Sequence, residues 1–338
     1  MKNIVLFDEF NEIDFKPSAL LQNYIRLTER DVSQFFIEKG PLQPGVCPGC
    51  HAKEIRSSFP RFSMDYVECA RCGTLYVSPR PDDRAIEDYY RRSSARRFWR
   101  ENLSRLTGKK RKEKIIKPRF EWILDSMTEY FPDASHILDI NTDHYGYIEV
   151  LIENKTFARK TLLNPYLPLD NLPLNDTIHV VKMTPEENAL DHEVDVLTLF
   201  EVADRTADVD RLFEKVSRLL RKNGLVFMTG ILSSGFDLQT LWDRAENIFP
   251  PDRLNVFSVE GFEGLFRRHG LECLEFSTPG ILDVDIVMKA LEQDKTVAIP
   301  RFIEYLLKNR SPETKQSLQE FLQKNLLSSY GRILLRKE

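Results

Sequence analysis

Four cysteines arranged in two close pairs constrain the fold of this chain more than any other feature. Cys47 and Cys50 enclose Pro-Gly, Cys69 and Cys72 enclose Ala-Arg, and eighteen residues separate the two pairs. A C-x2-C turn presents two thiolates to one ion, and structural zinc takes four such ligands in a tetrahedron. The spacing therefore predicts a zinc ribbon in which all four cysteines bind one structural zinc ion.

The residues between the two pairs alternate between apolar and polar, a pattern typical of a short β-hairpin. We expect His51 to lie outside the coordination sphere, because four thiolates already fill it. A redox role for two separate dithiols is an alternative, but matched pairs at ribbon spacing fit a closed site better. A catalytic zinc keeps one position open, so a structural role is predicted.

Composition and residue distribution predict a cytoplasmic protein without membrane contact. The chain of 338 residues has no run of about eighteen apolar residues. Near its start, Asp8, Glu9 and Glu12 interrupt the apolar stretch that a secretory signal requires. Four cysteines in a metal-binding pattern and one isolated cysteine suit a reducing compartment. The isolated Cys273 lies in a strand-like apolar run and is expected in the hydrophobic core.

Thirteen Lys and Arg residues gather within 91–119, which holds two acidic residues, although the whole chain has a net charge of -4. Phe98, Trp99, Leu103 and Leu106 occur there at helical spacing, which predicts a helical connector with its cations on the opposite face. Three interpretations stay open: a solvated face, binding of an acidic or phosphorylated ligand, or binding of nucleic acid. The solvated face is favoured most and nucleic acid least.

Helical patterns precede the second half of the chain. Apolar spacing within 17–39 predicts a lead-in helix, and 82–131 reads as helices broken near Gly108 and Pro118. From His136 onward, strand-like runs alternate with helical ones, and the run GRILLRK predicts a closing strand. This alternation favours an α/β fold with a doubly wound, mainly parallel sheet.

Several segments resemble class I S-adenosylmethionine-dependent methyltransferases. They are 136–151, 195–230 and 250–280, while 69–81 is similar to bacterial members that carry an N-terminal zinc ribbon. The resemblance implies a Rossmann-like methyltransferase fold, S-adenosylmethionine as cofactor and methylation of a small metabolite. Together with the sequence patterns, it predicts four regions: a helical lead-in at 1–40, a zinc ribbon at 41–81, a basic helical connector at 82–131 and a methyltransferase-like Rossmann domain at 132–338.

The glycine-rich loop of the family, D-x-G-x-G-x-G, is degenerate in this chain. The matching residues 139–145 read DINTDHY and contain no glycine. Glycine there allows a positive φ and a close approach of the backbone to the cofactor. The resemblance places Asp139, Asn141 and Asp143 around the methionyl end of the cofactor. The ring of Tyr145 and the carboxylate of Asp143 would both disfavour binding.

Other family positions are also altered. The acidic residue that commonly binds the ribose matches Asn164, an amide that offers no charged acceptor. After the fourth strand, the resemblance places Phe200 at the cofactor and Glu201 beside the substrate as the candidate catalytic residue. Two histidines of the family pattern are Arg205 and Arg253, and arginine cannot act as a general base.

Two hypotheses from different classes follow. The first is an enzyme that uses S-adenosylmethionine to methylate a small metabolite. The second is a catalytically inactive family member with a binding or scaffolding role. Its ligand could be an acidic partner or nucleic acid. An open cavity of roughly 300 Å³ or more above Asp139 would favour the enzyme, and a filled crevice would favour the second hypothesis.

Overall fold

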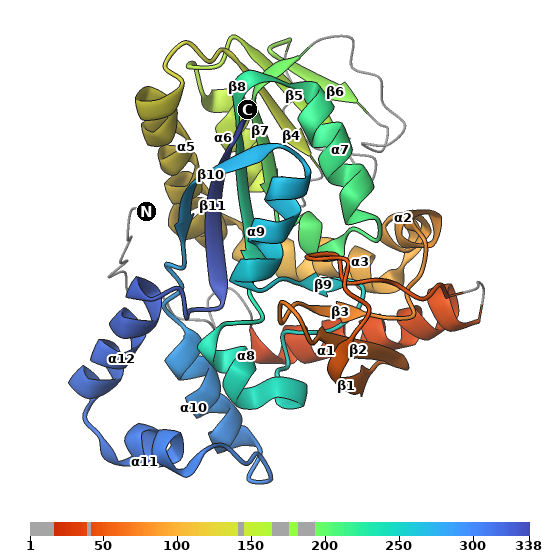
Figure 1. Cartoon of the computed structure of the whole chain (residues 1–338), viewed down its shortest axis with the longest axis vertical. Helices are drawn as coiled ribbons and strands as arrows, with labels where there is room; N and C mark the ends of the chain where they lie inside the picture. Colours follow the sequence, from red (N-terminus) through yellow and green to blue (C-terminus); the bar gives the residue numbers. More distant parts are fainter. Residues whose placement is uncertain (1–16, 39–41, 141–144, 164–175, 182–192) are drawn as a thin grey trace.

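The structure is a computed structural model, and it describes residues 17–38, 42–140, 145–163, 176–181 and 193–338. Two β-sheets organise it: a large central sheet and a smaller one near the N-terminus (Figure 1). None of the helices in these ranges is both long enough and apolar enough to cross a membrane.

The central sheet has seven strands in the order β10-β11-β8-β7-β4-β5-β6. Their bounds are β4 His136–Ile140, β5 Arg159–Leu163, β6 Ile178–Val181, β7 Val194–Phe200, β8 Leu220–Ile231, β10 Leu271–Ser277 and β11 Tyr330–Lys337. The closing strand β11 is antiparallel to both neighbours, and the other neighbouring pairs are parallel. The chain therefore starts in the middle, moves outward to β6 and returns to β7, which confirms the doubly wound, mainly parallel sheet.

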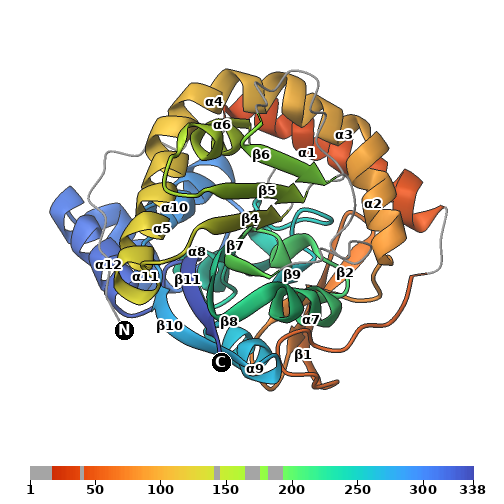
Figure 2. The same ribbon diagram turned by 90° about the horizontal axis from the view of Figure 1, so that it is seen from above.

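Helices cover both faces of this sheet, which is why β4 and β7 are buried along their whole length. Helices α5 Lys117–Tyr130 and α6 Tyr145–Glu153 contribute to the core on one face. Helices α7 Val209–Leu219 and α9 Val259–Arg268 pack on the other, and Figure 2 shows the two layers from above. The reversal of strand order between β4 and β7 creates a switch point, outside whose carboxyl ends such sheets bind ligands.

The smaller sheet contains the predicted hairpin of the ribbon and one strand from far along the chain. Its order is β1-β2-β3-β9, with bounds β1 Ile55–Arg61, β2 Met64–Cys69, β3 Leu75–Val77 and β9 Asn255–Val256. Leu75 in β3 pairs with Val256 in β9. The ribbon sheet is thus completed by residues about 180 positions later in the sequence.

The N-terminal helices run beneath the carboxyl edge of the sheet. They are α1 Ser18–Val32, α2 Asp83–Arg92, α3 Ser94–Phe98 and α4 Arg105–Arg111, with π-helical turns at Ser33–Ile37, Trp99–Ser104 and Lys112–Ile116. The predicted breaks near Gly108 and Pro118 are wrong, because the helical path continues from Ser94 to Tyr130. Pro118 lies in the first turn of α5, where proline is tolerated. The break lies instead at Ser93, whose side chain caps α3.

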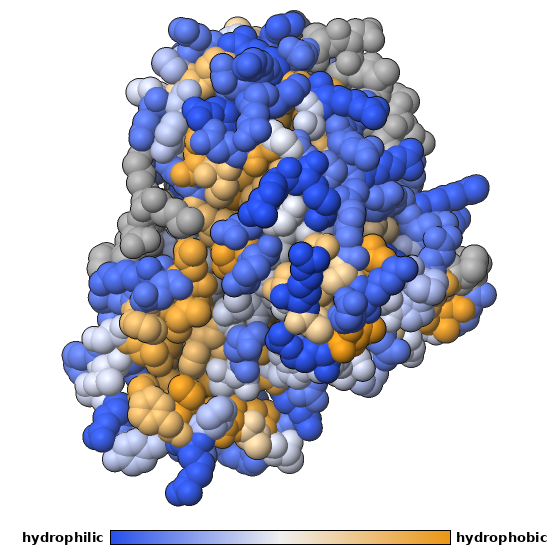
Figure 3. Space-filling view, viewed as in Figure 1, coloured by the Kyte–Doolittle hydropathy of each residue, from blue (hydrophilic) through white to orange (hydrophobic). Residues whose placement is uncertain are grey.

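Four more helices form the end of the molecule remote from β6: α8 Phe236–Leu241, α10 Asp283–Gln293, α11 Arg301–Asn309 and α12 Pro312–Lys324. The sequence patterns did not predict α10. Figure 3 shows apolar side chains gathered around these helices, and Phe302, Tyr305 and Phe321 are exposed there.

Candidate functional site

A cavity of about 450 Å³ lies outside the carboxyl end of β7, next to the switch point of the sheet. Its wall combines Phe200 and Glu201 from the end of β7 with residues of α1, α3, α5 and α10. The ribbon contributes Arg61, and the segment 243–253 contributes a further side. A volume of this size is suited to a small ligand.

Of the predicted cofactor residues that the structure describes, Phe200 lines the cavity and Asp139 does not. Asp139, in β4, is 1% exposed and accepts a hydrogen bond from Thr198 Oγ1 at 2.6 Å. Phe200 lines the cavity, and its ring packs at 82° against Tyr147, with centroids 5.5 Å apart. The cofactor predictions for Asn141, Asp143 and Asn164 fall outside the described residues, as does the side chain of Tyr145.

Glu201 lies between two arginines at the cavity wall. Its Oε1 accepts a hydrogen bond from Arg119 Nη2 at 3.2 Å, and its Oε2 accepts one from Arg253 Nη2 at 2.8 Å. The backbone of Glu201 has a φ of 58°, which turns the chain sharply at the end of β7. Arg253, which occupies a histidine position of the family pattern, therefore serves as an ion-pair partner here.

A second carboxylate lies behind Arg253. Asp204 is fully buried, its Oδ2 is 3.3 Å from Arg253 Nη1, and it accepts a hydrogen bond from the Ile231 backbone N–H. Burial raises the pKa of Asp204 to about 7, although the positive charge of Arg253 acts in the opposite direction.

Asp252 organises another part of the wall. Tyr24 donates to Asp252 Oδ2 at 2.5 Å, and Arg96 Nη1 donates to the Tyr24 hydroxyl at 3.2 Å. The Arg96 guanidinium lies over the ring of Tyr90 at 5.0 Å from its centroid. Burial raises the pKa of Tyr24 well above its usual range, so Tyr24 stays a hydrogen-bond donor at neutral pH.

The predicted solvated face of 91–119 is wrong for two of its cations and for one apolar residue. Arg96 is 3% and Arg119 is 9% exposed, and both line the cavity, whereas Leu106 is 66% exposed. Leu106 and Arg119 follow π-helical turns, each of which inserts one extra residue and rotates the following side chains by roughly 100° about the axis. Arg96 precedes these turns and faces inward from α3. The binding of an acidic partner or nucleic acid by this segment stays a prediction.

The four cysteines of the ribbon converge as predicted. Sγ of Cys47 lies 3.5 Å from that of Cys72, Sγ of Cys50 lies 3.5 Å from that of Cys69, and all four sulfurs lie within 4.8 Å of one another. A zinc tetrahedron with bonds near 2.3 Å has edges of about 3.8 Å, so the cluster suits a zinc ion. His51 lies outside this cluster and contacts Asp210 at 2.7 Å.

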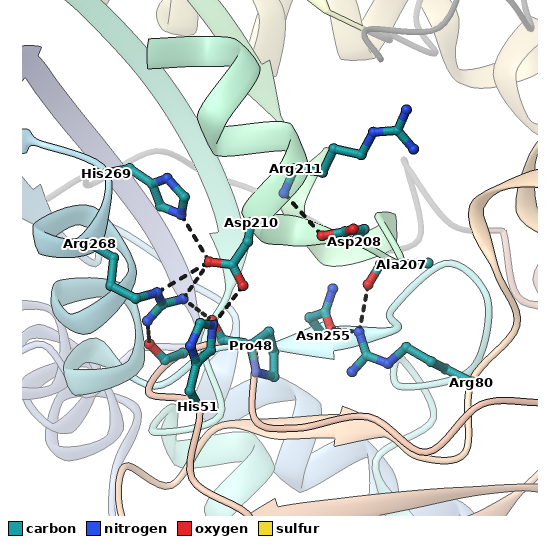
Figure 4. A network of polar contacts seen from close by, with 11 residues as sticks. Pro48, His51, Arg80, Ala207, Asp208, Asp210, Arg211, Asn255, Arg268 and His269 are labelled. Atoms are coloured by element: carbon teal, nitrogen blue, oxygen red, sulfur yellow. Dashed lines mark hydrogen bonds and ion pairs between the residues drawn. The ribbon is translucent and has the colours of Figure 1, made fainter. Parts of the chain in front are cut away.

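Asp210, on α7, connects the residue that follows the first zinc knuckle with the end of α9 (Figure 4). Its carboxylate contacts His51, His269 at 2.9 Å and Arg268 Nη2 at 2.9 Å. Burial acts to raise the pKa of Asp210, but the hydrogen bonds from these three residues outweigh it and lower the pKa. Arg268 also donates to the Pro48 carbonyl oxygen at 2.8 Å, so the first zinc knuckle is anchored to α9.

Sequence reasoning found Phe200, Glu201 and Arg253 but missed several residues of the cavity wall. Arg61 comes from the ribbon, and Tyr24 comes from the lead-in helix. Lys289 comes from α10, a helix that was not predicted. These side chains are brought together by long-range packing, and none carries a local motif that would have marked it.

Comparisons with known proteins extend these observations. A family model described as a methyltransferase domain matches residues 90–275, which is more than half of the chain. The solved structure of the plantazolicin methyltransferase BpumL in complex with SAH is 15% identical, covering 75% of this chain and 95% of its own, with a TM-score of 0.47. A putative sarcosine dimethylglycine methyltransferase from Galdieria sulphuraria is 19% identical, with coverages of 64% and 84% and a TM-score of 0.41. A comparison with curated proteins gave no match.

Proposed function

The chain belongs to the methyltransferase-domain family, and on that premise we propose that it transfers a methyl group from S-adenosylmethionine to a small-molecule acceptor. The observation that carries this proposal is the cavity of about 450 Å³ beside the switch point of the sheet. It exceeds the roughly 300 Å³ that a small-molecule site needs. Phe200 and Glu201, which the resemblance places at the cofactor and at the substrate, both line this cavity, whereas Asp139 does not.

S-adenosylmethionine, when bound, supplies an electrophilic methyl group on a sulfonium sulfur. The residues proposed to hold it are Asp139 and Phe200, together with Asn141, Asp143 and Asn164 from the resemblance. Phe200 offers an aromatic surface at the cavity, which suits an apolar or cationic group. Methyl transfer depends mainly on positioning, so the reaction does not require a dedicated base.

Glu201 is proposed to position neighbouring groups rather than to accept a proton. Both of its carboxylate oxygens accept hydrogen bonds from guanidinium groups, those of Arg119 and Arg253. Charge-assisted bonds of this kind are strong and directional. Glu201 would therefore hold the two arginines in fixed orientations beside the acceptor.

The second candidate function is that of an inactive family member that binds a ligand or partner. The observation that favours it is the loop 139–145, which lacks every glycine of the family pattern. Side chains at these positions oppose a close approach of the cofactor to the backbone. In this alternative, the cavity would hold a different small molecule.

Isothermal titration of the zinc-loaded protein with S-adenosylmethionine and S-adenosylhomocysteine distinguishes the two candidates. A variant that combines Asn141→Gly, Asp143→Gly and Tyr145→Gly is titrated beside the wild type. Micromolar binding by the wild type is the result expected for the enzyme. Binding by the glycine variant alone would favour the second candidate, and absence of binding by both proteins would overturn the proposal of cofactor use.

A further inference from the structure

We propose that Arg61, at the tip of the ribbon hairpin, binds an anionic group of the acceptor, either a carboxylate or a phosphate. This inference rests on the proposed function, because it identifies the chemical class of the molecule to be methylated. It also assigns the zinc ribbon a part in substrate recognition beyond its structural role.

The hairpin of β1 and β2 brings Arg61 to the cavity. Arg61 is the last residue of β1, and Phe62 and Ser63 form the turn with positive φ values of 51° and 61°. The ring of Phe62 packs against Phe249 with centroids 5.6 Å apart. This packing against the segment 243–253 makes Arg61 part of the cavity wall.

The charge of Arg61 has no carboxylate partner in the ranges that the structure describes. Its Nη2 donates to the backbone carbonyl oxygens of Asp243 at 2.6 Å and Ala245 at 3.2 Å. Its Nε is buried without a hydrogen-bond partner. The two carbonyl groups orient the guanidinium plane, but they do not neutralise its charge.

Other arginines of the wall are engaged differently. Arg119 and Arg253 both pair with Glu201, and Arg253 also lies 3.3 Å from Asp204. Arg244 lies 3.8 Å from the carboxylate of Asp243. Arg61 therefore differs from these three cations in having backbone oxygens alone as acceptors.

Carboxylates also line the cavity, but none of those described forms an ion pair with Arg61 that would neutralise its charge. Asp243 and Glu246 are exposed to solvent, where water and salt screen their charges. Asp294 accepts hydrogen bonds from the Thr296 backbone at 2.8 Å and its hydroxyl at 2.7 Å. Asp252 accepts hydrogen bonds from Tyr24 and Tyr90, and its Oδ1 lies 3.8 Å from Arg96 Nη1.

The chemistry of guanidinium selects the ligand class. Its planar arrangement of N–H donors matches the geometry of carboxylate and phosphate oxygens, and charge-assisted bonds are about twice as strong as neutral ones. A half-buried cation without a counter-ion disfavours a cationic acceptor and favours an anionic one. The acceptor is thus a small molecule that carries a carboxylate or a phosphate.

The test titrates the full-length, zinc-loaded protein separately with inorganic phosphate and with acetate, using calorimetry. The variants are Arg61→Gln, which removes the charge, and Arg61→Lys, which keeps the charge but removes the planar donors. The matched control is Arg84→Gln, an exposed arginine outside the cavity wall. Zinc content and melting temperature are measured for every variant.

Saturable binding of one probe is expected, and Arg61→Gln should weaken it about tenfold while Arg84→Gln leaves it unchanged. The probe that binds more tightly identifies the group as phosphate or carboxylate. Failure of both probes to saturate, or equal binding by wild type and Arg61→Gln, would overturn the inference. If Arg61→Gln loses zinc, the comparison of Arg61→Lys with Arg84→Gln decides, because weaker binding by Arg61→Lys supports the inference and equal binding overturns it.

The outcome is separable from that of the proposed function. S-adenosylhomocysteine binding should be the same in Arg61→Gln and wild type, because Arg61 is assigned to the acceptor. A protein that binds the anion but neither cofactor form would refute methyl transfer and retain the anion site. A protein that binds the cofactor, but whose anion binding is unchanged in Arg61→Gln, would refute the anion site and retain the proposal of cofactor use.

Discussion

Arg268 Nη2 lies 2.8 Å from the carbonyl oxygen of Pro48, so helix α9 is hydrogen-bonded directly to the first zinc knuckle. The pairing of β3 with β9 joins the ribbon to the segment before α9 through backbone hydrogen bonds. Loss of the metal should therefore affect the segment around β9 as well as the ribbon.

Replacement of Cys69 by Ser should release zinc and unfold the ribbon, because structural zinc contributes on the order of 10 kcal/mol to such small modules. Hydrogen exchange should also increase in β9, whose partner strand would be lost. Metal analysis and hydrogen-exchange mass spectrometry measure the two effects. Cys273→Ser, outside the cluster, is the control and should retain one equivalent of zinc. Tight retention of zinc by Cys69→Ser would refute the four-thiolate site.

Gly261→Ala should destabilise the contact between α9 and the ribbon. A Cβ atom at this position would lie 2.1 Å from Thr74 Oγ1, so one of the two elements would have to shift. Such overpacking typically costs about 1–3 kcal/mol, measurable by denaturant unfolding of the zinc-loaded protein. Gly108→Ala is the matched control in α4, where no heavy atom lies within 4 Å, and it should stabilise by about 0.5–1 kcal/mol. Equal effects of both substitutions would contradict this packing.

Asp204→Asn should change how stability depends on pH. Burial raises the folded-state pKa of Asp204 to about 7, so the folded protein holds this proton more tightly than the unfolded chain. The associated stability is present below about pH 4 and is lost as the pH rises through 7. Asn cannot ionise, so the variant should gain stability relative to wild type over this range, by up to about 1.4 kcal/mol per pH unit. Parallel profiles of unfolding free energy for the two proteins would argue against a protonated Asp204.

Glu201→Gln should loosen the cavity wall. The amide keeps one acceptor oxygen, but its NH2 group faces a guanidinium of Arg119 or Arg253. We expect a loss of about 1–3 kcal/mol in unfolding free energy. Binding of S-adenosylhomocysteine, measured by calorimetry, should also be weaker. Glu214→Gln, at an exposed position of α7, is the control and should change neither quantity. An unaltered stability in Glu201→Gln would mean that its two ion pairs contribute nothing to the fold.

The sequence alone was sufficient for the features that depend on local patterns. Two C-x2-C turns place their thiolates through neighbouring residues, so the spacing predicted the cluster of Cys47, Cys50, Cys69 and Cys72. Continuous apolar runs predicted the buried parallel strands and the closing strand β11. The family resemblance also brought Phe200 and Glu201 to notice, and both lie at the cavity.

Tertiary structure decided which side chains share the cavity and which elements share a sheet. Arg119 follows two π-helical turns, which shift its direction in a way that helical periodicity cannot predict. Arg96 is buried through packing against distant elements such as Tyr24 of α1. β9 joins the ribbon, and Arg61 meets the segment 243–253, across about 180 residues of sequence. Such contacts depend on the complementary shapes of surfaces that form when the chain folds, and no local pattern encodes them.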